Sequence, residues 1–328
     1  MSLIRTATRL RKPSSSRSTA MLFAAALAVT PSVAAAQAQL LIIGGLGGEP
    51  RYVDDFHRWG TALVDAARGR MGLPAENVIF LSEDPARDPT RINGESRREN
   101  IESAMRDMAR RAAPEDRIMI VIFGHGSSDT RGSRVNLPGP DITAKEYGEL
   151  LGVFGSRPVA FVNTASASGD FADVLAGPNR VIITATRSGL EKNETKFGGF
   201  FVDAFARDGA DADRNGRVTL REAFDYALRE TRRAYEMASQ LQMENARIEG
   251  DSTFITVFSI QNTSAAPTGA SVETEALFAR RRELEASVDA LRLRSGQMDP
   301  AEYAAEFERL LLELARVNQS IQAAGGTE

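Results

Sequence analysis

Short, continuously apolar runs rich in β-branched residues recur along the chain, and they constrain its fold more than any other feature. Continuous apolarity indicates strands that are buried on both faces, as in a mostly parallel sheet. Helix-like amphipathic segments separate the runs, so the pattern predicts an α/β layered domain over residues 39–260, with about six strands flanked by helices. The runs are LLII at Leu40, NVIFL at Asn77, RIMIVIF at Arg117, PVAFV at Pro158, RVIITA at Arg180 and TFITVFSI at Thr253.

Two sequence pairs predict helix starts inside this domain. Ser96 with Glu99, and Thr143 with Glu146, both have the spacing of a capping box. In such a box the hydroxyl accepts from a backbone N–H of the first turn, and the carboxylate accepts from the N–H of the capping residue.

The C-terminal residues have a different organisation. Residues 261–271, QNTSAAPTGAS, have few large apolar side chains and predict a linker. Residues 272–328 carry apolar residues at heptad-like spacing, interrupted by SGQ and restarted by Asp299 and Pro300, an N-cap and first-turn pair. We expect a coiled-coil-like helical hairpin whose apolar stripe packs on itself, on the main domain, or on a second copy or partner helix.

The N-terminal residues have the order of a secretory signal peptide. Basic residues precede a short apolar stretch at residues 21–29, and small residues follow, with A-x-A geometry at Ala34, Ala36 and Ala38. We therefore expect residues 1–38 to be a cleaved signal, with an uncleaved membrane anchor as the alternative. The mature chain is then expected to be exported, periplasmic or secreted, without a transmembrane segment.

Charge and cysteine content narrow the possible functions further. The formal net charge is −4 and no long basic block appears, so nucleic acid is not an expected partner. The sequence contains no cysteine, so neither disulfides nor thiol chemistry are available to it.

Two of the predicted strands lead into motifs at the carboxyl edge of the sheet, where functional residues gather in open α/β folds. The run at Arg117 leads into FGHGSSD, which places His125 between two glycines. The run at Pro158 leads into NTASASGD, which places Ser166 among small residues. A histidine in such a position serves either as a structural hydrogen-bonding residue or as a base.

A strand ending in H-G-S, followed by a strand ending in A-S-A-S-G, resembles the legumain-like branch of the caspase-fold cysteine peptidases. The resemblance covers most of residues 39–260 and implies a caspase-like sheet. It implies a catalytic dyad at His125 and Ser166, where the family has cysteine at the second position. It also implies a substrate pocket formed by Arg51, after the first strand, and by Thr184 and Arg187, at the end of the run from Arg180.

The serine at the nucleophile position departs from the family. A free thiol has a pKa of about 8.5, so modest help makes it a nucleophile at neutral pH. A hydroxyl needs a base hydrogen-bonded to it and a third group that orients the base. Asp129 and Asp170 are the acids closest in sequence to His125 and Ser166. The substitution predicts a degenerate dyad.

A second site has a sharper signature. DADRNGRVTLRE, residues 211–222, matches the calcium loop of an EF-hand, with a sharp-turn glycine at its sixth position. A polar loop that only caps the next helix is the alternative. Three nearby arginines and the single copy of the loop predict weak, structural binding, on the order of 10⁻⁴ to 10⁻³ M. The expected ligands are Asp211, Asp213, Asn215, Arg217 through its carbonyl, Thr219 and Glu222.

Three functions follow as hypotheses. The first is a non-catalytic member of the legumain-like family that binds a peptide or protein ligand in its cleft. The second is an active peptidase or other hydrolase that uses Ser166 with His125. The third is an assembly scaffold that acts through the C-terminal helical hairpin.

Overall fold

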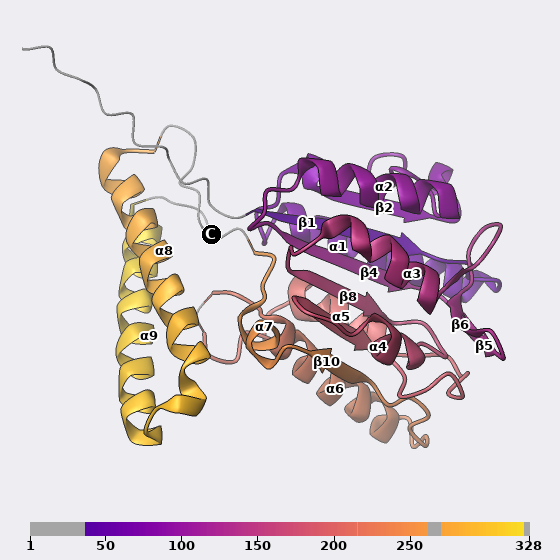
Figure 1. Ribbon diagram of the computed structural model, residues 1–328. Coiled ribbons are helices and arrows are strands. Elements are labelled where there is room, and N and C mark those ends of the chain that lie inside the picture. The colour runs from indigo at the N-terminus through magenta and orange to yellow at the C-terminus, as the bar shows by residue number, and fades with distance from the viewer. Residues whose placement is uncertain (1–36, 215, 262–269, 325–328) are drawn as a thin grey trace, which may run out of the picture. The chain divides into compact units, whose positions relative to one another are not determined.

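The computed structural model describes residues 37–214, 216–261 and 270–324. Within them, a mostly parallel sheet has the strand order β10-β9-β8-β4-β1-β2-β3, and only β10 runs antiparallel to its neighbour (Figure 1). This confirms the predicted mixed α/β fold, with seven strands instead of about six. The strands are β1 (Ala38–Gly44), β2 (Val78–Ser82), β3 (Gly94–Glu95), β4 (Arg117–Phe123), β8 (Val159–Asn163), β9 (Arg180–Thr184) and β10 (Arg247–Gly250).

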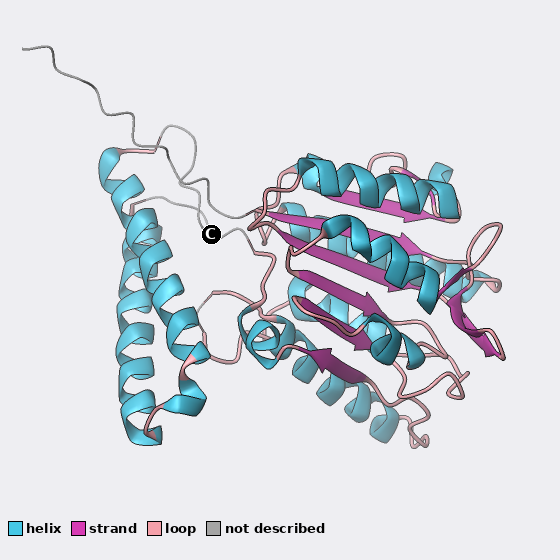
Figure 2. Cartoon of the chain, in the orientation of Figure 1, coloured by secondary structure: helices cyan, strands magenta, loops and turns pink. Residues whose placement is uncertain are grey.

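Helices cover both faces of the sheet, as Figure 2 shows. Alternate residues of each central strand enter two separate apolar cores, so that Leu40 and Ile42 pack on one face while Leu41 and Ile43 pack on the other. This double burial is the reason that the strand sequences are continuously apolar. The helices around the sheet are α1 (Pro50–Arg68), α2 (Arg98–Arg111), α3 (Ala144–Leu151), α4 (Asp170–Leu175), α5 (Phe197–Ala206), α6 (Leu220–Met237) and α7 (Ser252–Val257).

Smaller elements complete the domain. A three-stranded antiparallel sheet of β5 (Gly126–Asp129), β6 (Gly132–Val135) and β7 (Ile142–Thr143) follows β4 directly. The 3-10 turns are η1 (Ala75–Asn77), η2 (Pro85–Arg87) and η3 (Gly152–Phe154).

Two local predictions are wrong. The run at Thr253 forms helix α7, which packs Phe254 and Ile255 on the apolar core, and the sheet edge is instead the polar strand β10. Ser96 is not a cap, because its hydroxyl donates to the Gly44 carbonyl and α2 begins two residues later. The capping box of Thr143 and Glu146 is confirmed at the start of α3.

Helices α8 (Val272–Leu293) and α9 (Pro300–Ala323) form the predicted helical hairpin, joined through the 3-10 turn η4 (Ser295–Gln297). The Asp299 carboxylate caps α9 by accepting from two backbone N–H groups of the first turn. The predicted apolar stripe packs on itself between the two helices, around Leu284, Val288, Leu291, Leu310 and Leu314.

Two predicted segments lie largely outside the described residues: the signal peptide, of which only residues 37 and 38 are described, and the linker. In the described part of the chain, no helix is long and apolar enough to cross a membrane.

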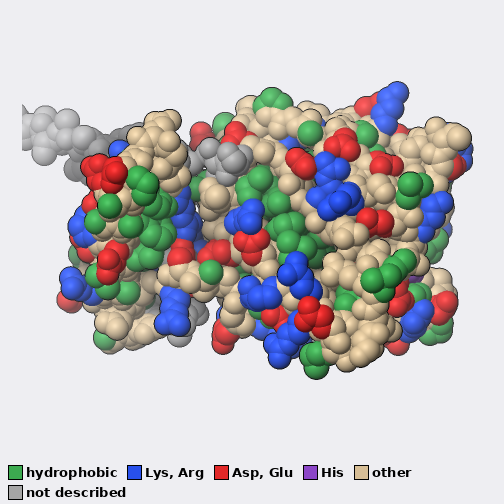
Figure 3. Space-filling view, turned by 90° about the horizontal axis from the view of Figure 1, so that it is seen from below, with side chains coloured by type: hydrophobic (Ala, Val, Ile, Leu, Met, Phe, Trp, Pro, Cys, Tyr) green, Lys and Arg blue, Asp and Glu red, His purple; other side chains and the backbone are tan. Residues whose placement is uncertain are grey.

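Acidic and basic side chains lie beside one another on the face seen in Figure 3.

Candidate functional site

The loops that carry His125 and Ser166 meet at the carboxyl edge of the sheet. They follow β4 and β8, which pair in parallel with Ile122 opposite Asn163. The approach is close at the backbone, because a Cβ atom built on Gly126 would lie 2.2 Å from the Ser166 carbonyl oxygen. The glycine of the H-G-S motif is therefore required by packing.

The Ser166 hydroxyl is engaged by the backbone of the opposite loop. Its Oγ accepts from the Gly126 N–H at 3.2 Å and lies 3.3 Å from the Gly126 carbonyl oxygen, to which it donates. Only 3% of the Ser166 surface is exposed. Among the described residues no hydrogen bond joins this hydroxyl to His125.

Neither acid that lies near the motifs in sequence orients the histidine. Asp129 is held by Arg131 and Arg134. Asp170 accepts from the Ser133 hydroxyl at 2.6 Å and from the Gly189 N–H at 3.1 Å. Both carboxylates thus fix local loop structure.

His125 packs against aromatic rings of α1. Its ring contacts Tyr52 edge-to-face at 4.5 Å between centroids, and Phe56 at 5.4 Å. Burial lowers the pKa of His125 below its usual value, and a hydrogen bond with the Gly47 backbone opposes this effect only in part. The imidazole is therefore neutral at neutral pH.

A groove opens beside His125, formed by two cavities of about 420 and 520 Å³. Helices α1 and α5 wall the smaller cavity, and the two cavities share four residues. Arg51 lines the groove, as the family resemblance implied. The other two residues implied for the pocket lie elsewhere: Thr184 is buried in β9, and Arg187 is exposed outside both cavities. The shared residues are Arg51, Tyr52, Glu194 and Lys196.

The predictions did not include the aromatic walls of the groove. Tyr52, Phe56 and Trp59 follow the first strand at positions i, i+4 and i+7, which is one face of a helix. That spacing was a usable signal, because a helix after the first strand must pack one face on the sheet. Lys196 and Glu194 carried no such signal, since they come from an irregular loop.

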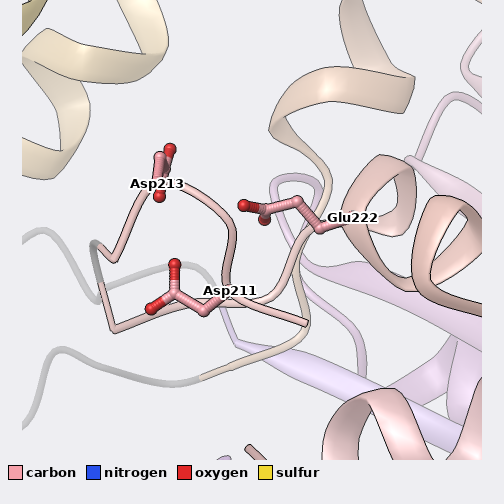
Figure 4. A group of neighbouring side chains, drawn as sticks. All are labelled: Asp211, Asp213 and Glu222. Atoms are coloured by element: carbon pink, nitrogen blue, oxygen red, sulfur yellow. The ribbon is translucent and has the colours of Figure 1, made fainter. Parts of the chain in front are cut away.

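The loop at residues 211–222 gathers three of its expected ligands. Carboxylate oxygens of Asp211, Asp213 and Glu222 lie within 4.8 Å of one another, and the three side chains converge in Figure 4. The Asp211 carboxylate also accepts from the Gly216 N–H at 2.8 Å, which closes the sharp turn. This donor set of hard oxygens suits calcium.

The remaining expected ligands have other roles or are not described. Thr219 caps α6 in a capping box with Glu222, so the alternative function of this loop as a helix cap is also present. Arg217 is buried, and Asp213 forms an ion pair with Arg292 of α8. Asn215 lies outside the described residues.

Comparison with known proteins does not identify a family. No family model and no curated protein matches the chain. Among solved structures, the chain is similar to a crystal structure of a Geobacter sulfurreducens protein, with 15% identity and a TM-score of 0.43. The match covers 67% of this chain and 96% of that chain. Similarity this distant says nothing about function.

Proposed function

We propose that this chain is an exported, non-catalytic relative of the legumain-like peptidases that binds a peptide or protein segment in the groove beside His125. The observation that carries the proposal is the hydrogen bonding of Ser166, whose Oγ is bonded to the Gly126 backbone and, among the described residues, makes no hydrogen bond with His125. A compartment outside the cytoplasm, either the periplasm or the medium, follows from the basic, apolar and small-residue order of the N-terminus.

The physical argument concerns the proton of the serine. A serine becomes a nucleophile when a base accepts its proton at about 2.6–3.2 Å and a third group orients the base. Here the carbonyl of Gly126 accepts the hydrogen bond of this hydroxyl, and Asp129 and Asp170 are engaged elsewhere. A hydroxyl is close in size to a thiol, so the loop keeps its shape without the accessible anion of a cysteine.

The groove keeps the features of a binding site. It is concave, has aromatic walls and carries a small number of polar groups, as ligand sites do. His125 contributes a neutral ring to this wall through its contacts with Tyr52 and Phe56.

The proposal predicts that binding survives the loss of the hydroxyl. A peptide array should identify ligands of the purified chain, and Ser166→Ala should bind them with unchanged affinity because Ser166 does not line the groove. Tyr52→Ala should weaken binding roughly tenfold, since it removes an aromatic wall. Isothermal titration measures both. An array without ligands, or loss of binding in Ser166→Ala, would contradict the proposal.

We also propose that the loop at residues 211–222 binds calcium as a weak structural clip. The convergence of Asp211, Asp213 and Glu222 supports it. Burial raises the pKa of Glu222, and hydrogen bonds from Thr219 and from the Ala212 N–H oppose this effect only in part. The ion pair between Arg292 and Asp213 must break before a calcium ion can bind Asp213 together with Asp211. This cost lowers the affinity of the loop for calcium.

Calcium should raise the melting temperature through this loop. An ion at about ten times its Kd stabilises the folded state by about 1.4 kcal/mol, or roughly 3 °C for a domain of this size. Asp211→Ala should abolish the shift, whereas Asp208→Asn, a fully exposed acid outside the loop, should keep it. Thermal melts with calcium or chelator measure the shift. An unchanged calcium response in both Asp211→Ala and Glu222→Gln rules the loop out as the site.

A further inference from the structure

The walls of the groove are aromatic. Tyr52, Phe56 and Trp59 come from α1 and Phe200 comes from α5. Neighbouring rings pack on one another, with centroids 6.3 Å apart for Tyr52 and Phe56 and 5.7 Å apart for Phe56 and Trp59. Such walls favour a flat apolar group, because aromatic pairs gain energy beyond the area that they bury.

The acids that line the groove are neutralised by arginines of the same groove. Each of the three carboxylates has a guanidinium within salt-bridge distance, so none of them is left to attract a cationic ligand. The pairs are Asp55 with Arg58 at 2.7 Å, Asp203 with Arg207 at 3.0 Å, and Glu194 with Arg51 at 3.3 Å.

Lys196 lines the groove, and its ammonium group forms no salt bridge with a carboxylate of the described residues. Its Nζ donates to the Gln240 amide oxygen at 3.0 Å and lies over the Tyr235 ring, and no salt bridge joins it to any described residue. The nearby acid Glu244 is buried and accepts from the backbone N–H groups of Lys196 and Phe197. Its two carboxylate oxygens are thus occupied by backbone donors, and no salt bridge joins them to the Lys196 ammonium.

Trp59 offers a second donor. Its indole N–H makes no hydrogen bond to any described residue. A Cβ atom on Gly199 would lie 2.8 Å from Nε1, so the glycine lets the indole pack directly against α5. Gly199 sits inside α5, where glycine costs about 1 kcal/mol relative to alanine. Lys196 and Trp59 thus give the groove two donors that no carboxylate of the described residues engages in a hydrogen bond.

We infer that the groove binds an aromatic group that carries a carboxylate, either a free aromatic acid or the C-terminus of a peptide that ends in an aromatic residue. The ring packs on the aromatic walls, and the carboxylate accepts from Lys196 and from the Trp59 N–H. This inference deepens the proposed binding function and rests on it, because it names the chemical class of the ligand.

The experiment uses matched acids and amides. Trp59 is the single tryptophan of the chain, so its fluorescence reports on this groove alone. The probes are 3-phenylpropionate with 3-phenylpropionamide, and Gly-Gly-Phe with Gly-Gly-Phe-amide. Each acid should bind roughly tenfold tighter than its amide, the ratio expected for a hydrogen bond to a charged group. Tighter binding of the peptide acid than of the free acid assigns the peptide C-terminus as the source, and the reverse assigns a free acid.

Lys196→Met should bring the affinity of each acid down to that of its amide. Lys192→Met, which removes an exposed charge outside both cavities, should leave the ratio intact. Equal affinity of acids and amides in the natural chain, no binding of either acid, or an unchanged ratio in Lys196→Met would overturn the inference. Peptide binding without an acid preference would overturn this inference alone, whereas cleavage of peptides would overturn the proposed function and leave the acid–amide comparison valid.

Discussion

Phe161→Ala should lower the free energy of unfolding by about 4 kcal/mol, because it removes a large ring from a closed core. Phe161 is fully buried in β8, with ring centroids 5.2 Å from Tyr147 and 6.0 Å from Phe171. Phe161 and Phe171 flank the Ser166 loop in sequence, so their stacking holds both ends of that loop. Urea unfolding followed by circular dichroism measures the loss.

Val174→Ala is the matched control for this prediction. Val174 lies in α4, close to Phe171 in sequence, but its side chain is exposed, so the change should stay within about 0.5 kcal/mol. If Phe161→Ala does not fold, Phe161→Leu should lose less than about 1.5 kcal/mol. A loss in Phe161→Ala that matches that of Val174→Ala would contradict the packing described here.

Gly126→Ala should lower the free energy of unfolding by about 3 kcal/mol, the upper end of the usual cost of overpacking. The added methyl group would lie 2.2 Å from the Ser166 carbonyl oxygen and 3.0 Å from that of Arg134, and backbone atoms cannot rotate away. Denaturant unfolding measures the effect.

Gly152→Ala is the control for the glycine prediction. Gly152 has a φ of −58°, and a Cβ atom there would meet nothing within 4 Å, so alanine should be neutral or slightly stabilising. A Gly126→Ala variant as stable as Gly152→Ala would show that the two loops are not in backbone contact.

The parallel strands are predictable from sequence because each central strand is buried on both faces. Strand β10 is not predictable from sequence, because Arg247–Gly250 is a short edge strand with two charged residues. Helix α7 has a strand-like sequence, and its helical state follows from how Phe254 and Ile255 fit the core. Tertiary packing overrides local propensity at both places.

The candidate site also has some features that are predictable from sequence and others that are not. The strand-end positions of His125 and Ser166 are predictable, because parallel neighbours bring their carboxyl ends to one edge. The hydrogen bonds of Ser166 with Gly126 are not predictable from sequence. They depend on the distance between the two loops to within tenths of an ångström. The loop at residues 211–222 is recognisable from sequence as a candidate calcium site because its expected ligands are local, whereas Arg292 reaches Asp213 from 79 residues away.

Turnover on a broad peptide library tests the central claim most directly, with products detected by mass spectrometry. The account predicts no cleavage by the natural chain, because the Ser166 hydroxyl donates its hydrogen bond to the Gly126 carbonyl and, among the described residues, no carboxylate hydrogen-bonds to His125. Ser166→Cys, assayed in parallel, reports whether the position can be reached by a thiol reagent. Cleavage by the natural chain that disappears in both Ser166→Ala and His125→Ala would contradict the account and make the protein a serine hydrolase.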